Sequence, residues 1–211
     1  MNRRLHANRV SSTQLKRTNG FLHFLACHRH HRFADTEHDV HSPVAGGFWW
    51  SHIGWILCPR FDYADESLVR DLAAFPELCW LDRNFLVPPA ALAVTLAILG
   101  WILPGTSALQ MVLWGFVIST VLVYHATFSV NSIAHQFGSR PYETNDNSRN
   151  NLFLAVIMLG EGFHNNHHRF PSSARFALQP KQLDLGYCIL VVLERLRLIR
   201  EMKIVVPETR S

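Results

Sequence analysis

The feature that most constrains the fold is a stretch of 56 consecutive residues, 84–139, without a single Lys, Arg, Asp or Glu. Two apolar segments, 85–103 and 108–128, lie inside it on either side of the turn-forming sequence Pro-Gly-Thr-Ser. As helices they would be about 28 and 31 Å long, close to the roughly 30 Å hydrocarbon core of a bilayer. The stretch predicts a transmembrane helical hairpin. The alternative is a buried hairpin of a soluble protein, for which 211 residues offer little covering material.

A hairpin brings both of its outer ends to the same side of a bilayer. The histidines before and after it can therefore face one aqueous compartment. Charged residues flank the outer ends and are missing from the short turn, so the positive-inside rule places this side in the cytoplasm. We expect an integral, multi-pass, all-α membrane protein that consists of one transmembrane helical hairpin and a cytoplasmic, helical, histidine-rich cap.

Charge and cysteine usage exclude several classes of protein. Residues 1–32 hold seven Lys or Arg and no acid, whereas the rest of the chain is slightly acidic. The positive charge thus belongs to an N-terminal arm, which we delimit as residues 1–27, and does not indicate a nucleic-acid-binding body. The arm lacks the apolar core of a secretory signal. Four cysteines without a CxxC pair, next to the long uncharged stretch, argue against a soluble zinc module.

Thirteen histidines are the unusual part of the composition. His164, His167 and His168 have the spacing i, i+3, i+4, so on a helix they share one face, and neutral imidazoles on one face are typical metal ligands. The alternative is an ordinary polar face. Asn131 and His135 are spaced i, i+4 just after the second apolar segment. Alone they could be a capping or core pair; near the first group, His135 becomes a further ligand with Asn131 acting through water.

An earlier group, His28, His30 and His31, has irregular spacing. His28 and His31 are i, i+3, but His30 would point about 160° away from His28 at about 100° per residue. Cys27, and not a histidine, has the i, i+3, i+4 spacing that would place it on one helix face with His30 and His31.

The sequence around these histidines resembles that of the membrane-bound fatty acyl desaturases, particularly the bacterial stearoyl-CoA delta-9 type. The matching strings are HRHHRFADTEHDVHSP with GFWWSHIGWIL, then NSIAH, then GEGFHNNHHRFP. The resemblance implies a desaturase domain over residues 28–207. It comprises the second histidine box at 28–31, the membrane hairpin at 85–128, the Asn/His motif at 131–135 and the third histidine box at 164–168. A C-terminal amphipathic helix is expected at 183–204.

The same resemblance implies a di-iron, O2-dependent acyl-CoA desaturase that introduces a cis double bond in unsaturated fatty acid biosynthesis. Its metal ligands would be His28, His30, His31, His135, His164, His167 and His168, with Asn131 through water. Partners would be a fatty acyl chain carried as acyl-CoA or acyl-lipid, membrane lipid and no nucleic acid. Because the sequence has no flavin, haem or iron–sulfur motif, a separate electron-donor protein is expected. Candidates for orienting the imidazoles are Asp35, Glu37 and Glu161; His38, His41, His52 and His125 are not expected to be ligands.

Two departures from the family pattern leave alternatives open. The second box reads HxHH where the family has HxxHH, and no HxxxxH box stands well upstream of it. His23 and His28 have that spacing but directly abut the second box. We therefore hypothesise an N-terminally truncated or frame-shifted family member. The alternatives to an active desaturase are a catalytically inactive fragment and a lipid hydroxylase on the same scaffold.

Overall fold

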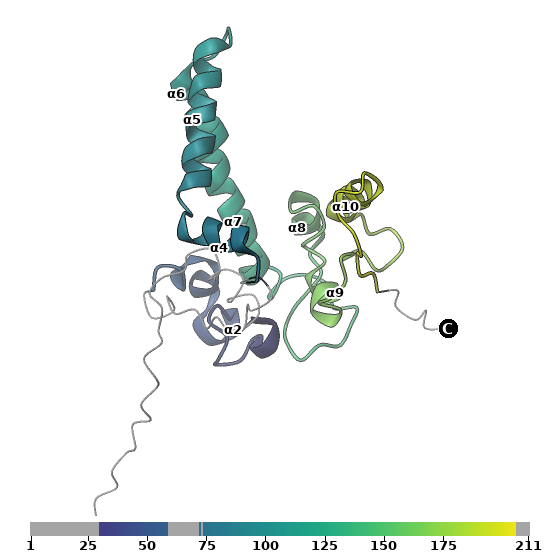
Figure 1. Ribbon diagram of the computed structural model, residues 1–211. Coiled ribbons are helices and arrows are strands. Elements are labelled where there is room, and N and C mark those ends of the chain that lie inside the picture. The colour runs from purple at the N-terminus through teal and green to yellow at the C-terminus, as the bar shows by residue number, and fades with distance from the viewer. Residues whose placement is uncertain (1–29, 59–71, 73, 206–211) are drawn as a thin grey trace, which may run out of the picture.

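The computed structural model describes residues 30–58, 72 and 74–205. Its regular structure is helical, and the β-pairing within the described residues is limited to two isolated bridges, Ser139 with Asn150 and Asn150 with Phe163. A long helical hairpin rises from a cap of short helices and loops (Figure 1). The prediction of an all-α fold is confirmed for the part of the chain that is described.

The hairpin pairs one bent helix with one long helix. The first arm consists of α4 (Pro76–Arg83) and α5 (Val87–Ile102), which meet at an angle of 72°. The second arm is continuous through α6 (Ala108–Val112), the π-helical η4 (Leu113–Ile118) and α7 (Ser119–Ser132). The second arm is therefore longer than the predicted 108–128, and it carries the chain directly to the Asn131 and His135 motif.

A tight turn joins the two arms. Gly105 adopts a φ of 81°, which suits glycine, and the Ser107 side chain caps the second arm by accepting from the Gln110 amide at 3.2 Å. Gly100 lies against the backbone of Ser107, where a Cβ would collide. The Pro-Gly-Thr-Ser sequence thus forms the turn that its composition predicts.

The surface of the hairpin is apolar. The 25-residue helix Ala108–Ser132 has a mean hydropathy of 1.7 and is long and apolar enough to cross a membrane, and α4 and α5 pass the same test together as a bent pair. None of the long helix's most apolar window is buried inside the protein. The described residues therefore leave the apolar surface of this helix uncovered.

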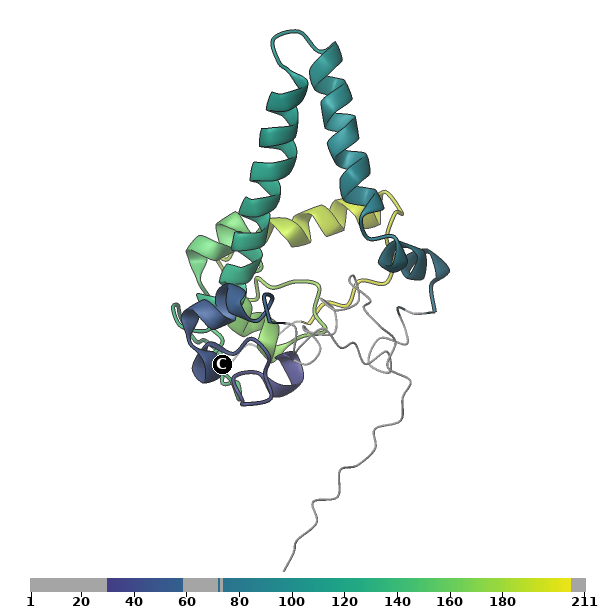
Figure 2. The same cartoon turned by 90° about the vertical axis from the view of Figure 1, so that its left-hand side faces the viewer.

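Among the described residues, the cap includes the short helical elements α2 (Pro43–Gly46), η1 (Trp50–Gly54), α8 (Leu152–Ile157), α9 (His164–Arg169) and α10 (Leu185–Arg195). α10 lies across the direction of the hairpin (Figure 2). Apolar packing in the cap is small: Ala155, Phe163 and Ala177 form a cluster with Phe176 against it. Most of the other buried side chains are polar, and histidines are prominent among them.

The C-terminal amphipathic helix is shorter than predicted. The prediction of 183–204 is right about its start, where Asp184 caps the helix by accepting from the Tyr187 amide at 2.8 Å. It is wrong about the end, because α10 stops at Arg195 and Arg197 has a left-handed φ of 61°. The chain then turns back, and the Ala174 amide donates to the Lys203 carbonyl at 2.8 Å. This long-range hydrogen bond requires the helix to end early.

Candidate metal centre

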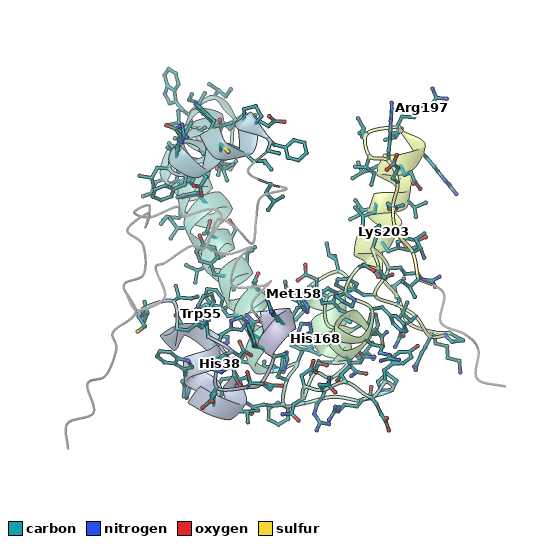
Figure 3. The ribbon with its side chains drawn as sticks, turned by 60° about the horizontal axis from the view of Figure 1, so that its bottom comes forward. His38, Trp55, Met158, His168, Arg197 and Lys203 are labelled. Atoms are coloured by element: carbon teal, nitrogen blue, oxygen red, sulfur yellow. The ribbon has the colours of Figure 1, made fainter. Side chains whose placement is uncertain are left out.

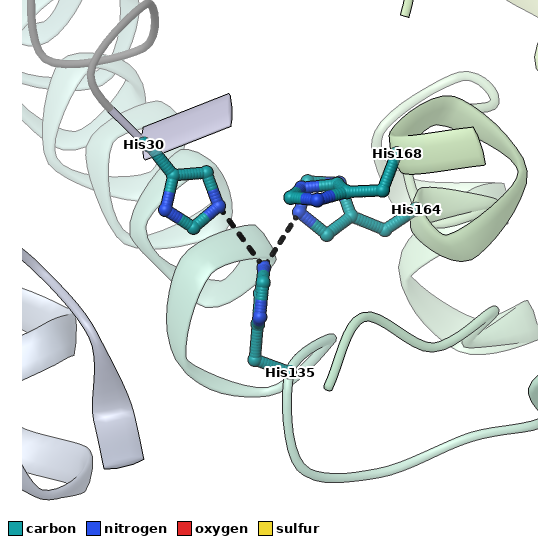
Figure 4. Close-up of side chains that lie close together, drawn as sticks. All are labelled: His30, His135, His164 and His168. Atoms are coloured by element: carbon teal, nitrogen blue, oxygen red, sulfur yellow. Dashed lines mark hydrogen bonds between the residues drawn. The ribbon is translucent and has the colours of Figure 1, made fainter. Parts of the chain in front are cut away.

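Four histidines from three distant segments converge in the cap (Figure 4). His30 lies in a helical turn at the start of the described chain, His135 follows the end of α7, and His164 and His168 lie on α9. The Nε2 atom of His135 is 3.1 Å from that of His30 and 3.0 Å from that of His164. One ring nitrogen from each of the four histidines lies within 4.8 Å of the others.

A carboxylate fixes the orientation of three of these imidazoles. Asp39 Oδ2 is 2.9 Å from His30 Nδ1, and Asp35 Oδ2 is 2.9 Å from His135 Nδ1. The third pair, Asp146 Oδ2 with His168 Nδ1, is 2.7 Å apart. A neutral imidazole has one N–H, so donation from Nδ1 to a carboxylate leaves a lone pair on Nε2. The three carboxylates therefore turn the acceptor nitrogens of these rings toward the centre of the cluster.

This arrangement fits a metal cation. The Nε2 lone pairs of His30 and His135 then face each other at 3.1 Å and repel unless both bind a cation. Imidazole nitrogens bound at right angles with metal–nitrogen bonds of about 2.1 Å would also be about 3.0 Å apart. His168 Nε2 is buried and has no hydrogen-bond partner among the described residues. A nitrogen that is buried without a partner is costly unless it binds a ligand.

The environment also disfavours protons at the cluster. Burial lowers the pKa of His164 well below its ordinary value, and the neighbouring imidazoles lower it further. Burial likewise lowers the pKa of His168, although its hydrogen bond to Asp146 opposes the shift. Neutral imidazoles are the form that binds metal, so the lowered pKa values keep these histidines in the metal-binding form.

A second histidine pair lies directly beside the first group. His31 Nε2 is 3.0 Å from His167 Nε2, and the His31 ring centroid is 4.7 Å from that of His168. Burial and the proximity of His168 lower the pKa of His167 to about 4. Adjacent residues in both boxes thus contribute to different parts of the site, because His30 and His31 point to different partners, as do His168 and His167.

The carboxylates are held in the charged form. Burial alone would raise the pKa of Asp39, but the hydrogen bond from His30 and the nearby imidazoles lower it to about 2. The same balance lowers the pKa values of Asp35 and Asp146 through His135 and His168, respectively. Asp35 also accepts from the Asn147 amide at 2.6 Å, which ties the loop before α2 to the loop that precedes α8.

Two fully buried asparagines fix α9. Asn165 accepts from the Tyr142 amide at 2.9 Å and donates to the Tyr142 carbonyl at 3.0 Å. Asn166 donates to the Phe176 carbonyl at 2.6 Å and accepts from the Asn150 side chain at 2.7 Å. The two residues between the histidines of the third box therefore anchor it to loops on both sides.

Most of the predicted site residues that the structure describes converge on the histidine cluster. Those brought together are His30, His31, His135, His164, His167 and His168. His28 lies outside the described residues. Asn131 is on α7, one turn before His135, and is partly exposed.

Among the carboxylates proposed to orient imidazoles, Asp35 contacts a site histidine and the two glutamates do not do so in the part of the chain that is described. Glu37 is exposed and lies 4.0 Å from His38, and Glu161 is exposed, with a pKa that partial burial raises. Asp39 and Asp146 take this role instead. Asp39 stands close to the second box in the sequence, a signal that could have identified it, but nothing local points to Asp146.

Two further histidines form a separate contact. His52 Nδ1 is 3.0 Å from Ser132 Oγ, and its Nε2 is 3.0 Å from His125 Nδ1. They connect η1 to α7, so they are structural in this arrangement. His41 stacks on His30 with ring centroids 4.4 Å apart and forms a smaller possible metal-binding group with His30 and Asp39.

Comparison with known proteins agrees with the histidine pattern. The fatty acid desaturase family profile matches residues 18–184. The chain is 38% identical over 188 residues to a protein of Anabaena variabilis named sn-1 stearoyl-lipid 9-desaturase, covering 88% of this chain and 66% of the relative. It is 35% identical over 188 residues to icosanoyl-CoA 5-desaturase of Limnanthes douglasii, covering 87% and 51%. A third relative, 34% identical over 198 residues, is a hex-5-enoyl-[acyl-carrier protein] acetylenase of Moorena producens, covering 86% and 60%.

These relatives are longer than the present chain, which spans about half to two thirds of their length. The match nevertheless includes every described histidine of the cluster and the hairpin between them. The chain belongs to the fatty acid desaturase family.

Proposed function

We propose that this chain is an O2-dependent fatty acyl desaturase with a di-iron centre. The observation that carries the proposal is the convergence of six histidines from the second box, the NSIAH motif and the third box, with three carboxylates behind them. One iron would be held by His30, His135, His164 and His168. The second would lie toward His31 and His167, with His28 and water-linked Asn131 as further ligands.

The reaction explains why such a site is needed. The hydrogens of two adjacent methylenes are unactivated, so a side-chain base cannot remove them. The iron centre would supply the oxidising power, with O2 as the acceptor of two electrons from the acyl chain and two from a donor. The product would be a cis double bond and water.

The residues of the chain would prepare this site in three ways. Asp39, Asp35 and Asp146 keep the Nδ1 protons of their histidines in place, so that Nε2 is available for binding. Burial of His135 and His164 excludes bulk water from the centre. Asn165 and Asn166 hold α9 against the loop before α8, through Tyr142 and Asn150.

The apolar hairpin supports a membrane-resident substrate. We propose that it spans the bilayer with the histidine cap on the cytoplasmic side, and that the fatty acyl chain arrives as acyl-CoA or acyl-lipid. The names of the relatives include both carriers. The electrons would come from a separate donor protein.

The test is product formation together with metal content. Membranes that contain the chain, supplied with a saturated acyl substrate, O2 and a reducing system, should yield a monounsaturated product by gas chromatography, and the purified chain should hold about two irons. A hydroxylated or acetylenic product would assign a different oxidation to the same site. A chain that folds but binds no iron would refute the proposal.

A further inference from the structure

A stripe of apolar side chains on α10 is exposed. Leu185, Cys188, Ile189 and Val192 on α10 and Leu196 at its C-cap are all exposed, and at about 100° per residue they fall within a sector about 100° wide. Glu194 lies on the opposite side of the same helix. In a water-exposed amphipathic helix the apolar sector would be the buried one; here it is the sector left open.

α8 repeats the pattern. Leu152, Phe153, Val156 and Ile157 are each at least half exposed, whereas Leu154 and Ala155 between them are buried against the cap. The exposed four have the spacing i, i+1, i+4, i+5 and so share one side of the helix. Within the described residues, an almost entirely apolar groove of about 400 Å³ lies between the end of α8 and α10, lined by Leu159, Leu185, Cys188, Ile189, Val192 and Leu193.

The position of these helices relates them to the hairpin. α8 and α10 form the part of the cap on the side from which the hairpin rises (Figure 1), and α10 runs across the hairpin direction (Figure 2). α9 and its histidines lie on the other side of these helices. If the hairpin spans a bilayer, α10 lies parallel to the membrane plane near the hairpin's base.

Charge at the end of α10 suits a lipid surface. Residues 194–203 contain four basic residues, Arg195, Arg197, Arg200 and Lys203, and two acidic ones. Arg197 and Lys203 follow the end of α10 and lie away from His168 (Figure 3). Basic residues beside an apolar stripe are typical of helices that lie in the interface of a bilayer with anionic lipid.

We propose that the exposed apolar faces of α8 and α10 form a membrane-docking surface, which lies in the headgroup region of the leaflet with acyl tails in the groove around Cys188. This docking rests on the proposed membrane insertion of the hairpin. It would hold the cap at a second point beside the hairpin and so fix the height of the histidine site above the acyl chains.

Cys188 itself permits a direct test. In the full-length chain with Cys27, Cys58 and Cys79 replaced by Ser, a nitroxide on Cys188 is measured by power-saturation EPR in vesicles of phosphatidylcholine with phosphatidylglycerol. Docking predicts high accessibility to O2 and low accessibility to a water-soluble nickel chelate. Matched labels report water, at Asn145→Cys in an exposed loop, and the bilayer interior, at Val94→Cys on α5, each with Cys188→Ser.

Each outcome has a distinct meaning. If the Cys188 label is as accessible to nickel as the Asn145→Cys label, the docking proposal is overturned. If it is protected from both O2 and nickel, a protein segment or second copy covers the face, which also overturns it. The Val94→Cys label reports membrane insertion of the hairpin separately, so failure of that step is distinguished from failure of α10 to dock.

Two sets of substitutions test the apolar and the electrostatic contributions to docking. Val192→Lys places a charge in the stripe and should expose the Cys188 label to nickel, whereas Glu194→Lys places the same charge on the opposite side and should not. Replacing Arg197, Arg200 and Lys203 by Gln should weaken docking about fivefold per residue in anionic vesicles at low salt, and far less in neutral ones. Equal effects of both lysine variants, or no dependence on anionic lipid, would contradict the proposal.

Discussion

The role of Asp146 can be tested by a near-isosteric change, Asp146→Asn. Asp146 Oδ1 accepts from the Ser148 amide at 2.9 Å and from the Thr144 hydroxyl at 3.0 Å, while Oδ2 is 2.7 Å from His168 Nδ1. An asparagine would keep its oxygen on Ser148 and Thr144 and turn its NH2 toward His168. Nδ1 would then accept a hydrogen bond, and the imidazole proton would move to Nε2.

This change of tautomer should weaken metal binding, because Nε2 of His168 is the nitrogen directed at the cluster. Loss of a carboxylate behind a metal-bound histidine typically costs 10- to 100-fold in affinity, or about 1.4–2.7 kcal/mol. We expect iron affinity to fall by this factor. Folding of the metal-free chain should change less, because the bonds to Ser148 and Thr144 are retained.

Competition with a calibrated chelator measures this affinity, and circular dichroism checks the fold. The matched control is Glu143→Gln, which removes the same charge three residues away at an exposed position. If Asp146→Asn and Glu143→Gln retain iron equally well, the argument from the His168 tautomer is refuted.

Three further predictions concern stability. The free energy of unfolding of the metal-free chain should fall between about pH 6.5 and 4, because His167 binds a proton near pH 6.5 when unfolded and only near pH 4 when folded; denaturation of His167→Gln at several pH values should show a shallower slope. Asn166→Ala should destabilise the fold by about 3 kcal/mol, since it removes the hydrogen-bond partner of the buried Asn150 and of the partly buried Gln182, and a fall in Tm similar to that of an exposed Asn→Ala change would contradict this. Asp184→Ala should cost about 2 kcal/mol through loss of the α10 cap, whereas Asp184→Asn should recover part of the lost Tm.

Residue spacing was sufficient to predict those parts of the structure that are formed by residues close together in the chain. His164, His167 and His168 lie on one short helix, so their grouping follows from helical geometry. The hairpin follows from an uncharged stretch with a Pro-Gly turn, although α5 is shorter and the second arm longer than predicted. The early end of α10 has no local signal, since it depends on a hydrogen bond between Ala174 and Lys203.

The irregular spacing of the second box shows the limit of helical geometry. On a helix His30 would point about 160° away from His28, at about 100° per residue, so one face cannot contain the whole box. The structure uses this divergence, with His30 beside His135 and His31 beside His167. The partners are 105 and 136 residues away, respectively.

By itself, the sequence determined which kinds of groups were available: imidazoles at metal-ligand spacing, an apolar hairpin and a family pattern. These properties follow from residue type and short-range periodicity. The tertiary structure decided which carboxylate lies behind which histidine, where each imidazole directs its free nitrogen, and which apolar faces remain open. These depend on contacts between segments far apart in the chain, as when Asp146 instead of the nearby Glu161 orients His168.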